Sequence, residues 1–373
     1  MRIGIDIKCL RDNNSGIGRY LSSLLDALQQ IDHENDYFLF SPREIRYAIT
    51  NERFKLCPYP GRFAFQKKYP GILWQQRILP RLLEQYKIDV IWGPEQTIPL
   101  GKSVSKKILT VHDFVYKRFP GTMRKSVLWI NRQIGEKSIV KADLVAVDSN
   151  FTRTELLHFH PKIDKDKVIV VPCGINRTTP SASESRKQNS LLFVGTLEPR
   201  KNLGNLIRAL EILDKKGISI ALTMTGPKGW KNSSENELLQ NSSVSRNIQH
   251  LGFVSDEELQ NLYATSTAVV FPSLYEGFGL PVLEALNHRT PVLTTKGSVM
   301  EEIAQDCGIY FDARDPESIA ECIEKFLSGQ QDFLQDKEDK RIAIIEKYQW
   351  KNSAAQLLHL FEQLAPSPKG GDA

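Results

Sequence analysis

The stretch that decides the fold lies in the second half of the chain, where residues 267–295 read TAVVFPSLYEGFGLPVLEALNHRTPVLTT. The apolar run 268–271 predicts a buried strand that ends at Pro272. Pro281 predicts the start of a helix, because proline suits the first helical position. The run 291–294 then predicts a second strand. A strand, a loop, a helix and a strand in this order are typical of a parallel α/β sheet.

The loop before the predicted helix carries the polar groups of this stretch. The amides of Phe278, Gly279 and Leu280 lie at a helix N-terminus, where free N–H groups and the helix dipole favour an anion. Glu276 and Glu284 flank these amides, and carboxylates accept hydrogen bonds from hydroxyl groups. Together these groups match a nucleotide sugar, which has a diphosphate, a ribose diol and a sugar diol. Taken alone, the stretch is more often a helix cap with two solvated glutamates.

The composition is that of a soluble globular enzyme. A length of 373 residues favours two domains, and 41% hydrophobic and 25% charged residues are ordinary values. The five cysteines are scattered, without metal-type spacing, which favours a reducing compartment. The first residues do not form a signal peptide, and no apolar run approaches the roughly 18 residues that span a bilayer. We therefore expect a cytoplasmic protein.

The first half of the chain is basic. Residues 1–180 hold 29 Lys and Arg against 18 Asp and Glu, whereas the remaining residues hold 20 against 26. Residues 53–87 contain eight basic residues, one acidic residue and seven aromatic residues, and residues 72–86 predict an amphipathic helix interrupted at Pro80. Such a mixture can bind an anionic membrane surface or nucleic acid, but no other nucleic-acid motif occurs. A helical hairpin with solvated lysines explains the pattern equally well.

Two positions in the first half are candidate ligand contacts. Residues 2–7 predict a strand, and the loop after it contains Gly16, where a phosphate could approach the backbone. The order is similar to a dinucleotide fingerprint, but Leu21 stands in the place of the third glycine, so NAD is not expected. A second predicted strand, 107–111, ends at His112. Ligands lie at the carboxyl ends of parallel strands, although a lone histidine there is more often structural.

The second half restarts the α/β pattern after a linker. Residues 177–190 have no apolar periodicity, and a strand follows them. Arg200 and Lys201 come directly after that strand, where two adjacent cations favour a phosphate contact over a basic loop in water. Asp164 and Asp166 match the D-x-D pattern of metal-dependent transferases, but they lie in a charged turn before a strand. No metal site is expected.

These elements predict four parts of the chain. Residues 1–176 are expected to form an N-terminal Rossmann-like acceptor-binding domain, followed by the linker 177–190. Residues 191–345 are expected to form a C-terminal Rossmann-like domain for a nucleotide-sugar donor. Residues 346–373 are expected to form a C-terminal helix, packed back on the first domain, and a tail.

With these elements placed, the chain resembles the retaining glycosyltransferases of family 4. Glu276 and Glu284 reproduce the paired glutamates of that family with seven residues between them, filled by GFGLPVL. The Gly16 loop, His112 and the run Arg200-Lys201-Asn202 occur in the expected order. The likeness covers nearly the whole chain, and it implies an α/β fold of the GT-B class, with two facing Rossmann-like domains that contain parallel sheets.

The resemblance also implies roles for single residues. Glu276 would hold the transferred sugar, and His112 would touch the sugar and the reacting centre. Glu284 would bind the ribose hydroxyls. The donor diphosphate would contact a third group of residues: Gly16, Arg200, Lys201, Phe278, Gly279 and Leu280. Many members carry an arginine where this chain has Thr196, so the leaving-group charge would depend on Arg200 and Lys201.

The activity implied by the resemblance is hexosyl transfer. The enzyme would move mannose, or else glucose, from a nucleotide-diphosphate sugar such as GDP-mannose to a saccharide or lipid-linked acceptor. It would need no metal or other cofactor. The bacterial members it looks most like build surface polysaccharides, so we expect a location at the inner face of the membrane, reached through residues 53–87.

Two other functions remain open. A nucleotide-sugar epimerase of GT-B fold would need base chemistry at C2 of the sugar and no separate acceptor. A non-catalytic nucleotide-sugar-binding subunit would need only part of the site. The basic and aromatic stretch argues mildly against the epimerase. The full set of Glu276, Glu284, Arg200, Lys201 and His112 argues against the binding subunit.

Overall fold

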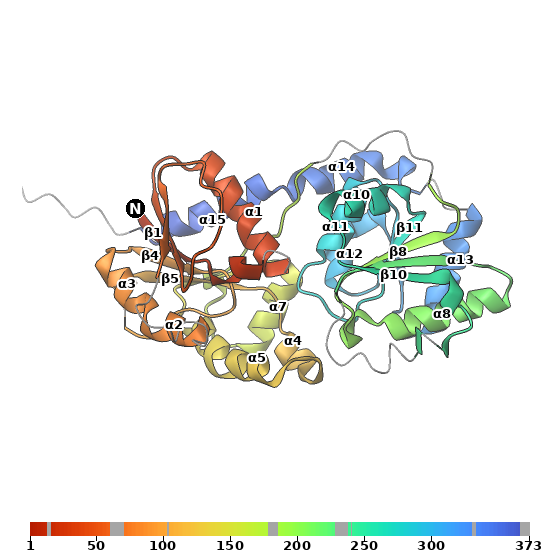
Figure 1. The fold of residues 1–373 in the computed structure, drawn as a ribbon, viewed down its shortest axis with the longest axis horizontal. Coiled ribbons are helices and arrows are strands. Elements are labelled where there is room, and N and C mark those ends of the chain that lie inside the picture. The colour runs from red at the N-terminus through yellow and green to blue at the C-terminus, as the bar shows by residue number, and fades with distance from the viewer. Residues whose placement is uncertain are drawn as a thin grey trace, which may run out of the picture. The chain divides into compact units, whose positions relative to one another are not determined.

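The structure is a computed structural model, and it describes residues 1–12, 16–59, 71–102, 104–177, 186–227, 238–239, 241–329 and 333–365. The chain divides into two compact units, each built around one parallel sheet (Figure 1). Unit 1 comprises Met1–Phe114, Lys125–Gly174 and Trp350–Ala373, and unit 2 comprises Val115–Arg124 and Ile175–Gln349.

The sheet of unit 1 has seven parallel strands in the order β3-β2-β1-β4-β5-β6-β7. Strands β2 and β3 lie on one side of β1 and strands β4 to β7 on the other, so the strand order reverses between β1 and β4. Helices cover both faces, and strand residues such as Ile3 and Ile5 are therefore fully buried. The strands are β1 (Arg2–Asp6), β2 (Asp36–Ser41), β3 (Phe54–Pro58), β4 (Val90–Gly93), β5 (Lys106–Val111), β6 (Leu144–Val147) and β7 (Val168–Val170).

The sheet of unit 2 repeats this plan with six parallel strands in the order β10-β9-β8-β11-β12-β13. Its order reverses between β8 and β11. The strands are β8 (Ser190–Val194), β9 (Ala221–Thr225), β10 (Ile248–Gly252), β11 (Ala268–Phe271), β12 (Val292–Thr295) and β13 (Gly308–Phe311).

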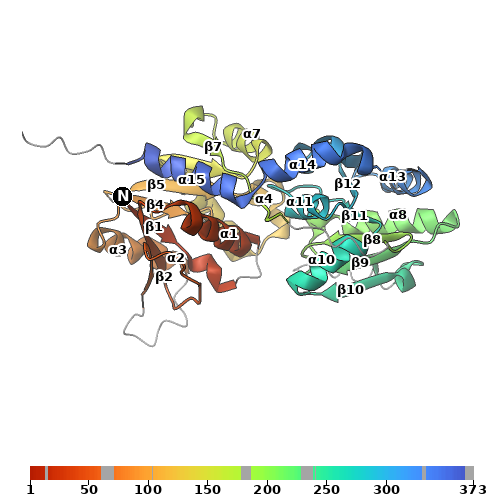
Figure 2. The same ribbon diagram turned by 90° about the horizontal axis from the view of Figure 1, so that it is seen from above.

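The helices of unit 1 include the C-terminal helix of the chain. In both views α15 lies beside α1 (Figures 1 and 2). The indole of Trp350 meets the ring of Tyr20 edge-on, with ring centroids 6.0 Å apart. Helices α5 and α6 are joined by a π-helical turn, Asn131–Gly135. The helices are α1 (Gly16–Ile31), α2 (Gly71–Arg77), α3 (Leu79–Gln85), α5 (Lys125–Ile130), α6 (Glu136–Lys141), α7 (Asn150–Phe159) and α15 (Trp350–Gln363).

The helices of unit 2 cover its sheet. Figure 2 shows α8 and α13 beside each other, where their buried leucines, isoleucines and phenylalanine join β8 in one core. Helix α10 begins with the capping box that Ser255 and Glu258 predict, and both reciprocal hydrogen bonds are present. The helices are α4 (Val115–Arg118), α8 (Leu203–Lys215), α10 (Asp256–Thr265), α11 (Leu280–Asn287), α12 (Val299–Ala304), α13 (Pro316–Gly329) and α14 (Glu338–Lys347).

The predicted class, α/β with parallel sheets in two Rossmann-like domains, is confirmed. The basic and aromatic stretch differs from the expectation, because it also contains β3. Phe54 stacks on Tyr37 with centroids 4.1 Å apart, and Trp74 is buried in the core cluster under α2 and α3. These two aromatic rings are core residues. Parts of the predicted loops and linker, residues 13–15, 60–70 and 178–185, and the tail 366–373 lie outside the described residues.

Within the described ranges, none of the helices is both long and apolar enough to cross a membrane.

Candidate active site

The candidate site of unit 2 lies where its strand order reverses. A 3₁₀ turn, Pro199–Lys201, follows β8 and its loop, and Asn202 then adopts a left-handed conformation with φ 61° before α8 begins. The Asn202 side chain donates hydrogen bonds to the carbonyls of Pro272, at 3.1 Å, and Ala313, at 2.6 Å. The first bond joins the turn after β8 to the loop after β11, and the second joins it to the residues after β13, so the three segments are fixed against one another.

The two loops meet in an ion cluster around Glu276. Its Oε2 lies 2.7 Å from Nη1 of Arg200, and its Oε1 lies 2.6 Å from Nζ of Lys201. Arg200 also bonds Glu198, with Nε to Oε2 at 3.1 Å, and the carbonyl of Tyr275, at 3.0 Å. The structure thus brings together three residues that the sequence placed at this edge of the sheet.

Burial and neighbouring charges have opposing effects on the pKa values in this cluster. Burial alone would raise the pKa of Glu276, but Arg200 and Lys201 outweigh it and lower the pKa to about 2. Burial and the neighbouring Arg200 lower the pKa of Lys201, against the opposing effect of Glu276. Arg200, Lys201, Glu198 and Glu276 together carry no net charge when all four are ionised. Arg200 and Lys201 present two adjacent cations to an anionic ligand once Glu276 turns away from them.

The start of α11 adds backbone donors beside this cluster. Gly279 caps the helix with φ 110°, a conformation that side chains rarely adopt, and a Cβ there would lie 3.4 Å from Cγ of Met300. Phe278 is buried edge-on against Tyr348, with centroids 5.6 Å apart. Among the described residues, none accepts a hydrogen bond from the amides of Phe278, Gly279 or Leu280. Such a helix start can receive a phosphate.

Glu284 is more buried than its helical position predicts. The spacing of Val282 and Ala285 predicts an apolar stripe that leaves Glu284 outside it, but every residue from 282 to 287 is buried. Oε2 of Glu284 accepts a hydrogen bond from the hydroxyl of Tyr263 at 2.7 Å, and this bond fixes the carboxylate.

The candidate histidine belongs to unit 1. His112 follows β5, and its Nδ1 lies 2.7 Å from Oδ2 of Asp148, at the end of β6. Its Nε2 lies 2.7 Å from the carbonyl oxygen of Pro94, and the ring meets Tyr20 edge-on. Burial would lower the pKa of His112, but the carboxylate of Asp148 outweighs it and raises the pKa to about 9. At neutral pH His112 is therefore an imidazolium, and its Nε2 reaches a ligand only by leaving Pro94.

Gly16 is the first residue of α1, in unit 1. A Cβ at this position would meet no atom of the part of the chain that the structure describes within 4 Å, and the residue is exposed. Packing against the described residues therefore does not require a glycine here, in contrast to Gly279. Asp164, in the D-x-D sequence, accepts the backbone N–H of Asp166 at 3.0 Å and so closes a 3₁₀ turn.

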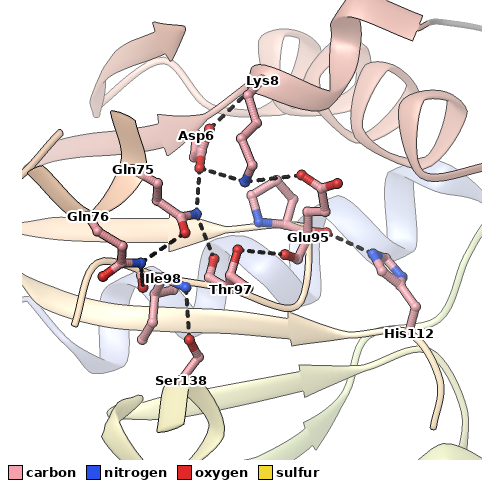
Figure 3. A network of polar contacts seen from close by, with 10 residues as sticks. Asp6, Lys8, Gln75, Gln76, Glu95, Thr97, Ile98, His112 and Ser138 are labelled. Carbon is pink, nitrogen blue, oxygen red and sulfur yellow. Dashed lines mark hydrogen bonds and ion pairs between the residues drawn. The ribbon is translucent and has the colours of Figure 1, made fainter. Parts of the chain in front are cut away.

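Sequence reasoning missed a second ion cluster, at the reversal point of unit 1. Lys8, after β1, lies 3.0 Å from Oε2 of Glu95, after β4, and 2.9 Å from Oδ2 of Asp6 (Figure 3). A signal was available, because Lys8 stands directly after the predicted strand 2–7 and Glu95 follows the apolar run 90–92 by three residues. The sequence did not show that these two strands are neighbours in the sheet.

Comparison with known families matches both halves of the chain. The family described as "Glycosyl transferases group 1" matches residues 176–364, and the family described as "Glycosyltransferase Family 4" matches residues 14–179.

Individual relatives agree with these families. The O-antigen chain mannosyltransferase B of Escherichia coli is 27% identical over 94% of this chain and 96% of its own length. The serotype-specific mannosyltransferase WbdA of Escherichia coli is 35% identical over 98% of this chain, which spans only 45% of that protein.

Solved structures of low sequence identity share the fold. The sucrose-phosphate synthase of Thermosynechococcus elongatus has a TM-score of 0.73 at 18% identity, over 98% of this chain and 99% of its own. Anabaena HepE in complex with UDP and glucose has a TM-score of 0.70 at 13% identity, over 97% of this chain and 100% of its own. These likenesses confirm the predicted GT-B class.

Proposed function

The chain belongs to the group 1 glycosyltransferases, and we propose that it is a retaining hexosyltransferase that uses a nucleotide-diphosphate sugar. Mannose is the favoured sugar and GDP-mannose the favoured donor, because two of its relatives are named mannosyltransferases. Glucose is the next choice. The acceptor is a saccharide or a lipid-linked saccharide of surface polysaccharide synthesis, as the O-antigen relative suggests.

One observation carries the proposal: Arg200 and Lys201 both contact Glu276, at the edge of the sheet where α11 begins. The diphosphate would bind the two cations and the amides of 278–280, and Glu276 would turn to the sugar hydroxyls. A charge-assisted hydrogen bond contributes about 1.5–3 kcal/mol and a helix N-terminus about 0.3–1 kcal/mol. Micromolar affinity needs about 8 kcal/mol, so several of these contacts must act together.

The cations also support a transfer without a metal ion. During the reaction the bond between the anomeric carbon and the phosphate oxygen breaks, and a bond to the acceptor oxygen forms on the same face. The acceptor proton passes to the leaving phosphate oxygen. Arg200 and Lys201 would stabilise the charge that develops on that phosphate. Full activity in the presence of a chelator would support this proposal, and loss of activity restored by a divalent cation would contradict it.

Two further residues are assigned roles, Glu284 in unit 2 and His112 in unit 1. The carboxylate of Glu284, held by Tyr263, would accept hydrogen bonds from the ribose diol. His112 would touch the sugar and the reacting centre through Nε2, exchanging the Pro94 carbonyl for the ligand. Because His112 is protonated at neutral pH, its role would be that of a cationic donor and not of a base.

A donor panel tests the proposed function. Wild-type protein is incubated with GDP- and UDP-hexoses and with membranes or oligosaccharides as acceptors, and the products are analysed by NMR. Transfer with an unchanged anomeric configuration supports the proposal. Inversion at C2 of the sugar would identify an epimerase, and binding without turnover would identify a binding subunit.

A variant tests the assignment of the nucleotide-binding carboxylate. We expect Glu284→Ala to weaken nucleoside diphosphate binding at least tenfold by calorimetry. Unchanged affinity would contradict the ribose assignment. Trapping of a covalent sugar on a carboxylate with a slow donor would contradict the same-face transfer.

We also propose that residues 53–87 hold the enzyme at the inner face of an anionic membrane. Lys55, Arg77 and Arg81 are exposed, as are the apolar side chains of Tyr59 and Leu73. Reversal of the three cations to glutamate should reduce sedimentation with phosphatidylglycerol vesicles and leave donor hydrolysis unchanged.

A matched control distinguishes this surface from another one in unit 1. The segment 125–141 exposes Lys125, Arg132 and Lys137 around Trp129, which is 59% exposed. Reversal of these three cations should leave vesicle binding unchanged. If only this second reversal reduces binding, the membrane contact lies on α5 and α6 and the proposal for 53–87 is wrong.

A further inference from the structure

The reversal point of the first sheet is the part of unit 1 where a ligand is expected. In open α/β sheets, ligands bind outside the carboxyl ends of the strands at the point where the strand order reverses, because the loops there leave in opposite directions. In unit 1 this point lies between β1 and β4. Asp6 ends β1, Lys8 comes two residues later and Glu95 follows β4, and the three side chains form one connected network (Figure 3).

Lys8 is fixed in this network from two sides. Its ammonium lies 2.9 Å from Asp6 and 3.0 Å from Glu95, and its side chain is only 14% exposed. Burial would lower the pKa of Lys8, but the two carboxylates outweigh it and raise the pKa. Asp6 is held in turn by Nε2 of Gln75 at 2.7 Å, and the same nitrogen donates to the carbonyl of Thr97 at 3.0 Å. The network is therefore rigid and already in place before a ligand binds.

Glu95 is the member of the network that reaches solvent. Its side chain is 37% exposed, whereas its Oε2 is buried and faces Lys8. Within the described part of the chain, no hydrogen bond or ion pair engages Oε1. Asp6, Lys8 and Glu95 together carry one net negative charge. An oxygen held in this way accepts hydrogen bonds from hydroxyl groups and repels anions.

Unit 2 offers an independent parallel. There Lys201 follows β8 and contacts Glu276, which follows β11, at 2.6 Å. Lys8 and Glu95 occupy the same positions relative to their own sheet, since β1 and β4 are also the strands on either side of the reversal. Each unit thus carries a lysine–glutamate pair across its reversal point, and in unit 2 that pair lies in the proposed donor site.

We propose that Lys8 and Glu95 form a second sugar-binding subsite, which holds a neutral, hydroxyl-rich sugar of the acceptor and excludes an acceptor with a carboxylate or phosphate at that position. The assignment of this sugar to the acceptor rests on the proposed function. Oε1 of Glu95 accepts hydrogen bonds from a pair of sugar hydroxyls, and Lys8 holds the carboxylate in place.

The test compares two probes that differ only in charge. Methyl α-mannoside and the corresponding methyl α-mannosiduronic acid differ at C6, which carries a hydroxymethyl group in one and a carboxylate in the other. Binding of each to the full chain, saturated with a nucleoside diphosphate, is measured by saturation-transfer NMR titration. We expect the wild type to bind the neutral glycoside at least ten times more tightly than the uronate.

Two variants and one control test whether Glu95 causes the preference for the neutral glycoside. Glu95→Gln keeps the shape and removes the charge, so we expect the preference to fall below threefold. Glu95→Ala should weaken binding of the neutral glycoside at least tenfold. Glu34→Gln, an exposed glutamate before β2 at the opposite edge of the sheet, should change neither value. Unchanged affinity for the nucleoside diphosphate shows that each variant is folded.

The outcomes separate the subsite from the proposed function. If Glu95→Gln retains the full preference, or if the wild type does not bind methyl α-mannoside, the subsite is overturned even when hexose transfer is observed. If the preference is lost on substitution but no donor is turned over, the sugar-binding subsite stands and the proposed transferase activity fails.

Discussion

The two reversal points of this molecule share a geometry and differ in charge. In unit 2, Lys201 after β8 contacts Glu276 after β11 at 2.6 Å, and in unit 1, Lys8 after β1 contacts Glu95 after β4 at 3.0 Å. In both units the lysine belongs to a 3₁₀ turn that lies between a strand and the next helix. The same fold therefore places the same pair of residue types at the same position twice.

The surroundings of each pair decide what it can bind. In unit 2 Arg200 adds a cation and its partner Glu198 a carboxylate, and the start of α11 adds backbone donors. Asp6 adds an anion to the pair of unit 1, and none of the described residues between Glu95 and β5 is helical. One pair suits a phosphate and a sugar together, whereas the other suits sugar hydroxyls alone. The fold supplies the position, and single residues beside it supply the chemistry.

The largest expected effect is the loss of hexose transfer when Glu276 is replaced. We predict that Glu276→Ala lowers the rate of hexose transfer by at least about 10³-fold, comparable to the loss of a group that stabilises a transition state. Nucleoside diphosphate binding should survive, because Arg200 and Lys201 remain and lose their competing carboxylate. Initial rates and calorimetry measure the two effects. If Glu276→Ala abolishes nucleotide binding and retains transfer, the assignment of Glu276 to the sugar is wrong.

The next prediction concerns the pH dependence of stability, which should differ between the two units. The pKa of His112, in unit 1, is raised from 6.5 to about 9, so its ion pair with Asp148 stabilises the unit below pH 6.5 and is lost as the pH rises to 9. The pKa of Glu276, in unit 2, is lowered from 4.5 to about 2, so its contribution is present above pH 4.5 and lost as the pH falls to 2. Each contribution is on the order of 3 kcal/mol, at about 1.4 kcal/mol for each pH unit between the folded and unfolded pKa.

Hydrogen exchange, corrected for intrinsic rates, reports the two units separately. Protection of β5 and β6 should decrease between pH 6.5 and 9, and protection of β8 and β11 should decrease between pH 4.5 and 2. His112→Gln should flatten only the first dependence, and Glu276→Gln only the second. Equal effects of either variant on both units would contradict the separation.

The third comparison is between one cation of each unit, Arg200 in unit 2 and Lys8 in unit 1. Removal of a charge-assisted contact costs about 1.5–3 kcal/mol, so Arg200→Ala should weaken nucleoside diphosphate binding about tenfold to a hundredfold. Lys8→Met should leave that affinity within about twofold, because the network of unit 1 carries net negative charge. Calorimetry of both variants provides the measurement. A matching loss in Lys8→Met would show that both lysines serve the phosphates.

Local patterns were readable from the sequence. The strand, loop and helix of 267–295 follow from an apolar run, a glycine and a proline within a few residues of one another. The capping box at Ser255 and Glu258 is equally local, and the structure shows both of its bonds. Arg200 and Glu276 were each expected to follow a strand of the second sheet, and the structure shows that the two side chains meet.

Features that depend on contacts between distant segments of the chain could not be predicted from the sequence. Lys8 and Glu95 are 87 positions apart, and only the pairing of β1 with β4 brings them together. Glu284 is buried although its position lies off the apolar stripe. One reason is that α14 packs on α11, where Arg341 bonds the carbonyl of Leu286 at 2.9 Å. The strand β3 was missed because an edge strand buries only part of its residues, and its alternation is weak.

The smallest expected effect concerns one glycine in each unit. Gly279 has φ 110°, and a Cβ there would lie 3.4 Å from Met300, so Gly279→Ala should destabilise the protein by about 1–2 kcal/mol. A Cβ on Gly16 would meet no atom of the described residues within 4 Å, so Gly16→Ala should change the free energy of unfolding by at most about 0.5 kcal/mol. Urea unfolding of both variants provides the measurement.

Donor affinity then shows why a glycine stands at each place. If the diphosphate approaches the backbone at the start of α1, Gly16→Ala should weaken donor binding several-fold although its stability is unchanged. Gly279→Ala should lower donor affinity and stability together, because the same backbone conformation caps α11 and aims its amides. Full donor affinity in Gly16→Ala would remove Gly16 from the proposed site. The phosphate contacts would then consist of groups of unit 2 alone.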